Sequence, residues 1–172
     1  VVVLSSNYEL YGDMSSRVVS VLARFAPELE VYSIDESFLD LTGVSDPLEL
    51  STRMRDQVKQ WTGIPISVGL GSTKTLAKAA NRLAKKQGIG CELIEKYCRE
   101  ALVRIAIEDV WGIGRRLSVR LRRIGLLNAW QFARAPSPSI REIGGVTLER
   151  TQRELTGISC LEMEEQAPPR KN

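Results

Sequence analysis

The first 95 residues alternate between short apolar runs and segments in which apolar positions recur every three or four residues. The short runs predict strands, and the helical spacing predicts amphipathic helices. The expected strands are residues 1–4, a strand–turn–strand that ends at Thr42–Gly43, residues 64–70 and residues 90–94. Such an alternation is typical of an α/β layer.

Three helices are expected between these strands. Ser15 or Asp13 is suited to cap the first helix, and Pro27 ends it. The second begins where Asp46 precedes a proline, and the third covers Lys74–Lys86. The positions expected to face inward are Val18, Val21, Leu22 and Phe25 in the first helix, Leu50, Met54, Val58 and Trp61 in the second, and Leu76, Ala80, Leu83 and Ala84 in the third.

Strand patterns stop after residue 95, and helical spacing takes their place. It covers residues 96–106, 115–124, 128–135 and 146–156. Prolines at 136 and 138 and the glycine pair at 144–145 interrupt it. We therefore expect an α+β fold in which a catalytic domain at 1–95 precedes a small all-α domain at 96–161 and a linker at 162–172.

Charge is distributed unevenly, although the net formal charge is only +3. Residues 1–95 carry 10 Lys/Arg and 12 Asp/Glu, whereas residues 96–157 carry 12 and 6. This asymmetry favours chemistry in the first part and polyanion binding in the second. No apolar run approaches the roughly 20 residues that a membrane-spanning helix needs, so no membrane partner is expected.

The chain has no histidine and 3 cysteines without paired spacing. The absence of histidine excludes Ser–His and Cys–His catalytic pairs and the common zinc sites. The cysteine pattern does not predict a disulfide framework and favours a reducing cytoplasm. A metal bound here would therefore have oxygen ligands, which favours magnesium, manganese or calcium.

Two carboxylates stand side by side within an apolar, strand-like run at residues 31–42. Strand interiors disfavour acids, and a buried carboxylate is costly unless something pairs with it, so Asp35 and Glu36 suggest a cation site. Neighbours on an ideal strand point to opposite faces, so both acids approach the same ions only if the backbone turns beside them. Two divalent ions held there could activate an attacking oxygen and stabilise a leaving phosphate oxygen. A surface hairpin with solvated acids accounts for the pair equally well.

A polar and basic row follows one face of the third expected helix. Its members are Lys74, Lys78, Asn81 and Lys85. Their spacing places them along one helical face, and ammonium groups above an acidic metal site would suit a triphosphate. An ordinary solvated face of an amphipathic helix explains the same row.

A glycine-rich turn, Gly112–Ile113–Gly114, lies between two expected helices and precedes a strongly basic segment. Such a turn frees backbone N–H groups at the start of the second helix, where they and the helix dipole attract phosphate. Five arginines follow within nine residues: Arg115, Arg116, Arg120, Arg122 and Arg123. We expect a helix-hairpin-helix that binds the DNA backbone independently of sequence. A basic surface helix with a capping turn is the alternative.

Together these motifs resemble those of Y-family translesion DNA polymerases. The run from Tyr32 to Thr42, with Asp35 and Glu36 at its centre, is similar to the palm signature of that family. Segments 5–11, 74–78 and 109–116 narrow the resemblance to the UmuC type, the catalytic subunits of bacterial DNA polymerase V and their plasmid-borne relatives. The motifs cover essentially the whole chain in the family's order.

The resemblance implies a role for each candidate residue. Asp35 and Glu36 match the palm acids that serve two catalytic Mg²⁺ ions, with Mn²⁺ as an alternative metal. Lys85 and Lys78 match basic positions that contact the incoming dNTP. The thumb element that grips primer–template DNA is matched by Gly112, Ile113, Gly114, Arg115 and Arg116.

The resemblance also implies an architecture and partners. Residues 1–95 would be a partial palm, 96–161 a thumb with a helix-hairpin-helix, and 162–172 a linker toward a little-finger domain. The family's first metal-binding aspartate and its sugar-selecting aromatic residue are not in the chain, so these 172 residues alone are expected to be inactive. The implied partners are an accessory-protein dimer, a recombinase filament and a sliding clamp, at the nucleoid of the bacterial cytoplasm.

Two other functions stay open at this point. A non-catalytic helix-hairpin-helix module would use the basic hairpin and keep the acids as structural residues. A two-metal nuclease would use the acids, but nothing else in the sequence supports it.

Overall fold

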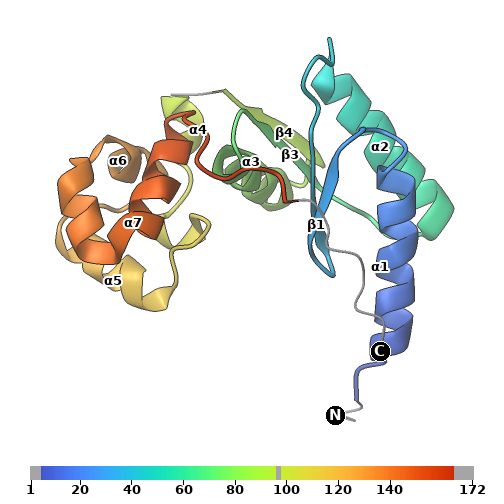
Figure 1. The fold of residues 1–172 in the computed structure, drawn as a ribbon, viewed down its shortest axis with the longest axis horizontal. Helices are drawn as coiled ribbons and strands as arrows, with labels where there is room; N and C mark the ends of the chain where they lie inside the picture. The colour runs from blue at the N-terminus through green and yellow to red at the C-terminus, as the bar shows by residue number, and fades with distance from the viewer. Residues whose placement is uncertain (1–4, 96–97, 165–172) are drawn as a thin grey trace. The chain divides into compact units, whose positions relative to one another are not determined.

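The computed structural model describes residues 5–95 and 98–164 as a mixture of helices and small sheets (Figure 1). The described chain divides into two compact units, one with residues up to Ile66 together with Met163 and Glu164, the other with Ser67–Glu162. The strand expected at 1–4 and most of the linker expected at 162–172 lie outside the described residues.

The first unit begins with helix α1, Tyr8–Leu22. Asn7 caps it, because its side-chain oxygen accepts a hydrogen bond from the N–H of Leu10 at 3.0 Å. The predicted caps were wrong: Asp13 lies inside the helix and pairs instead with Arg17 at 2.8 Å. The helix therefore begins about two turns before the start that either predicted cap implied, and Asn7 is the residue that accepts from a first-turn N–H group.

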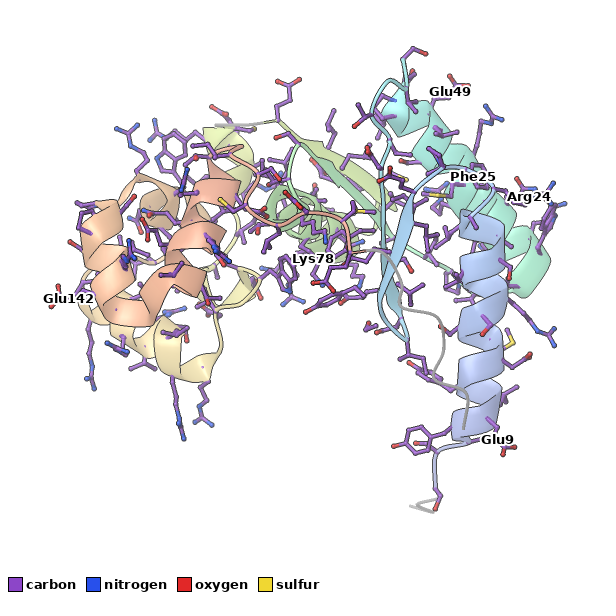
Figure 2. The ribbon with its side chains drawn as sticks, viewed as in Figure 1. Glu9, Arg24, Phe25, Glu49, Lys78 and Glu142 are labelled. Atoms are coloured by element: carbon purple, nitrogen blue, oxygen red, sulfur yellow. The ribbon has the colours of Figure 1, made fainter. Side chains whose placement is uncertain are left out.

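Helix α2, Pro47–Thr62, confirms the predicted start at Asp46, whose carboxylate accepts from the N–H of Glu49 at 2.9 Å. It ends at Gly63, which has a φ of 75°. Val58 is fully buried, as expected. The prediction for Trp61 was wrong, because this residue is 49% exposed. The guanidinium group of Arg24, which Figure 2 labels, lies 4.8 Å from the centroid of the Trp61 ring.

The second unit opens with a β–α–β arrangement of β3 (Val68–Gly71), α3 (Lys74–Gln87) and β4 (Cys91–Ile94), in which the two strands are parallel. Strand β3 is shorter than the predicted 64–70. Its glycines have a packing role: a Cβ on Gly69 would lie 2.1 Å from the backbone of α3. This close approach brings α3 directly onto the two-stranded sheet.

Helices replace strands after β4, as predicted. They are α4 (Arg99–Leu102), the 3₁₀ turn η1 (Ile107–Asp109), α5 (Arg115–Arg123), α6 (Ala129–Arg134) and α7 (Ser137–Leu155). Two bounds differ from expectation. Of the described residues within the helix predicted at 96–106, only the four of α4 are α-helical. Helix α7 starts well before residue 146, since proline is tolerated in a first turn. Gly145 has a non-helical backbone, with φ 72° and ψ −169°, and interrupts α7 at the glycine pair, where the sequence predicted an interruption.

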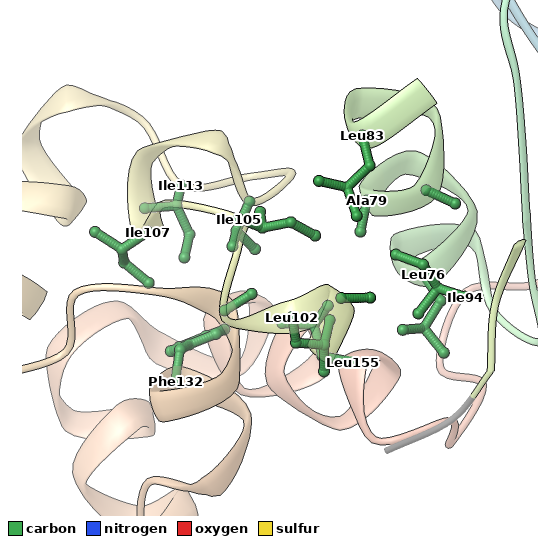
Figure 3. Packing of buried hydrophobic residues seen from close by; sticks show 14 of the residues in the cluster. Leu76, Ala79, Leu83, Ile94, Leu102, Ile105, Ile107, Ile113, Phe132 and Leu155 are labelled. Carbon is green, nitrogen blue, oxygen red and sulfur yellow. The ribbon is translucent and has the colours of Figure 1, made fainter. Parts of the chain in front are cut away.

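One apolar core holds the second unit together. The α3 residues Leu76, Ala79 and Leu83 face residues of the later helices (Figure 3). Fully or almost fully buried members include Leu102, Ile105, Ile107, Leu121, Phe132, Ile140 and Leu155. Helix α3 is therefore held in one core with the helices that follow residue 98. In the described part of the chain, no helix is both long and apolar enough to cross a membrane.

Candidate functional site

The adjacent acids lie at the tip of a hairpin in the first unit. Strand β1 (Leu29–Ser33) pairs antiparallel with β2 (Glu36–Leu39), and Ser33 stands opposite Glu36. Ile34 and Asp35 form the turn between them. The predicted strand–turn–strand is thus confirmed, and the backbone does turn at the acids.

The pairing register shifts between Val31 and Ser33, so Tyr32 occupies a bulge in β1. A bulge adds one residue to one strand and twists the hairpin locally. The Tyr32 ring packs edge-on against Phe38 of the partner strand, with centroids 5.8 Å apart. This aromatic pair packs the bulged side of the hairpin, three residues before Asp35.

Asp35 is exposed, and its carboxylate accepts a hydrogen bond from the Ser33 hydroxyl at 2.7 Å. Glu36 is half-buried at the first position of β2. Both side chains offer hard oxygen donors of the kind that magnesium and manganese prefer. The pair therefore fits a divalent cation, with Ser33 orienting one carboxylate. Among the described residues, no group of three or more His, Cys, Asp or Glu side chains gathers in a metal-binding arrangement.

A third acid of the same run has a structural role. The Asp40 carboxylate accepts hydrogen bonds from the Thr42 N–H at 2.8 Å and from the Thr42 hydroxyl at 2.6 Å. These two bonds hold the pKa of Asp40 below its usual value, with the hydroxyl contributing most. Asp40 thus closes the turn that follows β2.

The predicted basic row on α3 lies in the second unit, and its members have different partners. Lys74 donates from Nζ to the backbone oxygen of Glu162 at 2.6 Å, and the Asn81 amide donates to the Ser67 oxygen at 2.6 Å. Lys85 is exposed near the end of the helix. The row is therefore not a uniform phosphate-facing surface, because at least two of its members bind neighbouring backbone.

Lys78 is the member of the row that reaches the candidate DNA-binding hairpin. Its Nζ lies 5.7 Å from the ring centroid of Trp111, within the range of a cation–π contact. Figure 2 labels Lys78 on α3. Two residue groups that the sequence placed in separate motifs are thus in direct contact.

The glycine-rich turn Gly112–Ile113–Gly114 leads directly into α5. Gly112 has a φ of 81°, the Ile113 side chain is buried, and Gly114 precedes the first turn of α5. The N-terminus of α5 has no side-chain cap, and Arg115 and Arg116 are exposed beside it. Unsatisfied first-turn N–H groups and flanking guanidinium groups make this end of α5 suited to bind phosphate. The element before the hairpin is the 3₁₀ turn η1, not a full α-helix.

Two acids of η1, the element before the hairpin, form ion pairs with helices α5 and α3. Glu108 accepts two hydrogen bonds from Arg122 of α5, both at 2.5 Å. This contact lowers the pKa of Glu108 and raises that of Arg122. Asp109 accepts from Arg82 of α3 at 2.5 Å, and Lys86 lies 3.5 Å away. The sequence analysis missed these pairs, because their partners are 14 to 27 residues apart and no local spacing connects them.

Comparison with known proteins supports the same resemblance. UmuC of Salmonella typhimurium is 45% identical over 99% of the chain. MucB of Escherichia coli is 35% identical over the same share, and residues 1–82 match the impB/mucB/samB family. The chain is thus similar to proteins of the impB/mucB/samB family. This similarity confirms the resemblance drawn from the motifs. The chain spans 42% of the length of these UmuC and MucB relatives.

A more distant relative and solved structures are also similar to the chain. DNA polymerase IV of Picrophilus torridus is 31% identical over 69% of the chain, which spans 34% of that relative. The crystal structure of DinB from Sulfolobus solfataricus has a TM-score of 0.75, with 24% identity, 90% of this chain covered and 47% of that one. A chimeric Y-family DNA polymerase has a TM-score of 0.78, with 23% identity, 94% of this chain covered and 48% of that one. The chain therefore has the fold of the matching part of these polymerase structures.

Proposed function

We propose that this chain is part of a template-directed DNA polymerase that copies past damaged bases. The names of its relatives, UmuC and DNA polymerase IV, support a polymerase. The observation that carries the proposal is the hairpin tip, where a two-residue turn presents Asp35 directly beside Glu36. Adjacent carboxylates at a hairpin turn supply ligands for the divalent ions of nucleotidyl transfer.

In this proposal Asp35 and Glu36 bind the catalytic metals, Mg²⁺ or Mn²⁺, and Ser33 orients Asp35 through the 2.7 Å hydrogen bond. When bound, such ions activate the attacking primer 3′-oxygen and stabilise the charge on the leaving pyrophosphate. The protein's own contribution is to hold both carboxylates at a fixed turn, since catalysis of phosphoryl transfer rests mainly on positioning and charge.

Lys78 and Lys85 are proposed to bind the triphosphate of the incoming dNTP. Lysine offers a compact positive charge with three donors, which suits phosphate oxygens. Lys85 is exposed. Lys78 is half-buried and forms a cation–π contact with Trp111. We expect Lys85 to contribute charge and Lys78 to contribute a more defined position.

The DNA-binding element is proposed to be the hairpin Gly112–Ile113–Gly114 with Arg115 and Arg116. The uncapped start of α5 and these exposed arginines support phosphate binding without base recognition. In the corresponding architecture, residues 1–95 form part of a palm, 96–161 a thumb with a helix-hairpin-helix, and 162–172 a linker toward a little-finger domain. By the same family likeness, an accessory-protein dimer, a recombinase filament and a sliding clamp are the proposed protein partners.

Primer extension by the full-length polypeptide tests the proposal. Asp35→Asn and Glu36→Gln should each lower metal-dependent extension by about 100-fold or more, as losing a charge-stabilising group in an active site commonly does. Glu49→Gln is the matched control, because Glu49 is an exposed acid of the same unit, on α2 (Figure 2). Undiminished extension by both hairpin variants would refute the assigned metal-binding role.

The basic hairpin supports a second candidate function, a non-catalytic DNA-binding module. Metal titration separates the two functions. Saturable Mn²⁺ binding that Asp35→Asn abolishes favours the polymerase. DNA binding that is unaffected by metal, with no extension under any condition, favours the module.

A further inference from the structure

The segment that follows α7 has no regular secondary structure, and side chains hold its backbone in place. Residues 158–164 lie outside every helix and strand of the described chain. Among the described residues, 160–162 make no backbone–backbone hydrogen bond. Backbone N–H and C=O groups that are sheltered from water need partners. We call residues 160–162 the strap, and its partners are found on two helices of the second unit.

One buried carboxylate accepts from the first two N–H groups of the strap. The Oε1 atom of Glu154, at the end of α7, accepts from the N–H groups of Cys160 and Leu161, both at 3.0 Å. Glu154 is fully buried, whereas Cys160 and Leu161 are only half-buried and the following Glu162 is exposed. Water therefore has a route to these two N–H groups as soon as the strap moves away from the carboxylate.

A lysine at the start of α3 binds the last residue of the strap. The Lys74 ammonium donates to the backbone oxygen of Glu162 at 2.6 Å, and Lys74 is the first residue of α3. Within the described part of the chain, three hydrogen bonds from the charged side chains of Lys74 and Glu154 therefore attach the backbone of the strap.

The buried carboxylate is held on its other side without any help from the strap. Its Oε2 atom accepts from the N–H and the hydroxyl of Thr75. The backbone oxygen of Glu154 accepts from the Thr73 hydroxyl at 2.9 Å, and the next residue, Leu155, lies in the apolar core. Glu154 thus keeps its position when the strap leaves, so opening of the strap requires no change in the core.

We propose that residues 160–162 open and close as one strap on Glu154 and Lys74 while the core of the second unit stays folded. Segments that open locally in folded proteins are those with few buried apolar contacts and with backbone hydrogen bonds near solvent. The strap has both properties. Because three consecutive residues carry its attachments, breaking one of them removes the restraint that keeps the neighbouring two in place.

The strap sets the length of free chain between the two units. When it is closed, the backbone is held in the second unit as far as Glu162, and the N–H of Glu164 is held by a carboxylate of the first unit at 2.8 Å. Only Met163 lies between these attachments. When it is open, Ile158 is the last residue held by α7, and residues 159–163 are free. Opening thus lengthens this connection by roughly 13 Å of extended chain.

Hydrogen exchange of the full-length polypeptide measures this opening without any ligand. In the wild type, the N–H groups of Cys160 and Leu161 should show equal protection, and both should exchange at least about tenfold faster than the N–H of buried Leu155. Lys74→Met should speed exchange at both strap residues by about three- to tenfold, the equivalent of one hydrogen bond. Neither of these two N–H groups is bonded to Lys74, so a shared increase reports opening of the whole strap.

Two further variants and a second measurement accompany this experiment. Lys74→Arg keeps a cationic donor and should retain most of the protection, and Lys85→Met is the matched control, since Lys85 is an exposed lysine of the same helix. Cleavage by a glutamate-specific protease after Glu162 follows the population of the open strap. It should rise in Lys74→Met by the same three- to tenfold factor, while cleavage after Glu142, inside α7, should not change.

Each of three results would overturn the proposal. Exchange at Cys160 and Leu161 that is as slow as at Leu155 would mean that the strap opens only when the core unfolds. Unequal protection of the two strap residues in the wild type would mean that they open separately. Unchanged exchange at both in Lys74→Met would mean that the attachment at Glu162 does not hold the rest of the strap. None of these measurements uses DNA or a nucleotide, so they stand apart from the test of the proposed function.

Discussion

The buried carboxylate of Glu154 accepts two hydrogen bonds from Thr75, one from its N–H at 2.9 Å and one from its hydroxyl at 2.8 Å. Its other oxygen accepts from the N–H groups of Cys160 and Leu161, both at 3.0 Å. A side chain of α7 thus satisfies donors at the start of α3 and in the segment after α7. This carboxylate joins three parts of the second unit at one point.

Glu154→Gln should destabilise the protein, because an amide cannot accept four hydrogen bonds and brings two donors among existing donors. We expect a loss of about 1–3 kcal/mol in the free energy of unfolding, measured by urea denaturation. Glu142→Gln is the control, since Glu142 is an exposed acid on the same helix (Figure 2). Equal stability of the two variants would contradict the role given to Glu154.

Gly69→Ala should be strongly destabilising. The added methyl group would lie 2.1 Å from backbone atoms of both Ala77 and Asn81, and main-chain atoms of a packed helix cannot move aside cheaply. We expect a loss of about 3 kcal/mol or more. Gly12→Ala is the matched change, in α1 with nothing within 4 Å, and it should instead gain about 0.5–1 kcal/mol in thermal or urea unfolding.

The Glu108–Arg122 pair predicts a specific dependence of stability on pH. Folding lowers the pKa of Glu108, chiefly through the hydrogen bond from Arg122, so its contribution is complete above the usual carboxyl pKa. That contribution is lost as the pH falls through the lower, folded pKa. Glu108→Gln should therefore lower the melting temperature slightly at pH 7 and leave it unchanged at strongly acidic pH.

Salt offers a control for this prediction, because both side chains of the pair are nearly half exposed, at 45% and 46%. Solvent and ions screen such a pair. The difference between wild type and Glu108→Gln at pH 7 should shrink in molar salt. A difference that persists in high salt or at low pH would point to packing as the cause.

DNA affinity should fall steeply with salt if the hairpin binds the DNA backbone. Arg115→Gln and Arg116→Gln should each weaken binding to all sequences alike and reduce the slope of log affinity against log salt by about 1. Fluorescence anisotropy across a salt series measures the slope. Arg17→Gln, on α1 of the first unit, is the control that should leave it unchanged. A slope that is flat in the wild type would contradict the DNA-binding assignment.

Elements governed by local chemistry were predicted well from the sequence. Asp46 and Glu49 predicted the start of α2 correctly. Helical spacing with a following glycine predicted the end of α3 to within one residue. The turn at Asp35 follows from the need to accommodate an acid in a strand-like run. In each case the deciding interactions lie within a few residues of one another.

Features that depend on distant partners were missed. Nothing local distinguishes Glu154 from the other acids of α7, because its hydrogen-bond donors lie 79 residues earlier and six or seven residues later. Trp61 was expected inside for a similar reason: its apolar ring fits the helical stripe, yet Arg24 covers it at the surface. Burial of such residues is decided by the elements that pack beside them, which periodicity does not describe.

The bulge at Tyr32 has a consequence for how this hairpin can change over evolutionary time. By taking up one extra residue, it leaves a connection of only two residues between Ser33 and Glu36. A single insertion or deletion in either strand would reverse which side chains face the solvent. The length of a strand can therefore change by one residue only if a bulge is lost or gained at the same time. The tip bearing the two acids is thus shielded from gradual changes in chain length, and differences among relatives should gather in the loops before Leu29 and after Asp40.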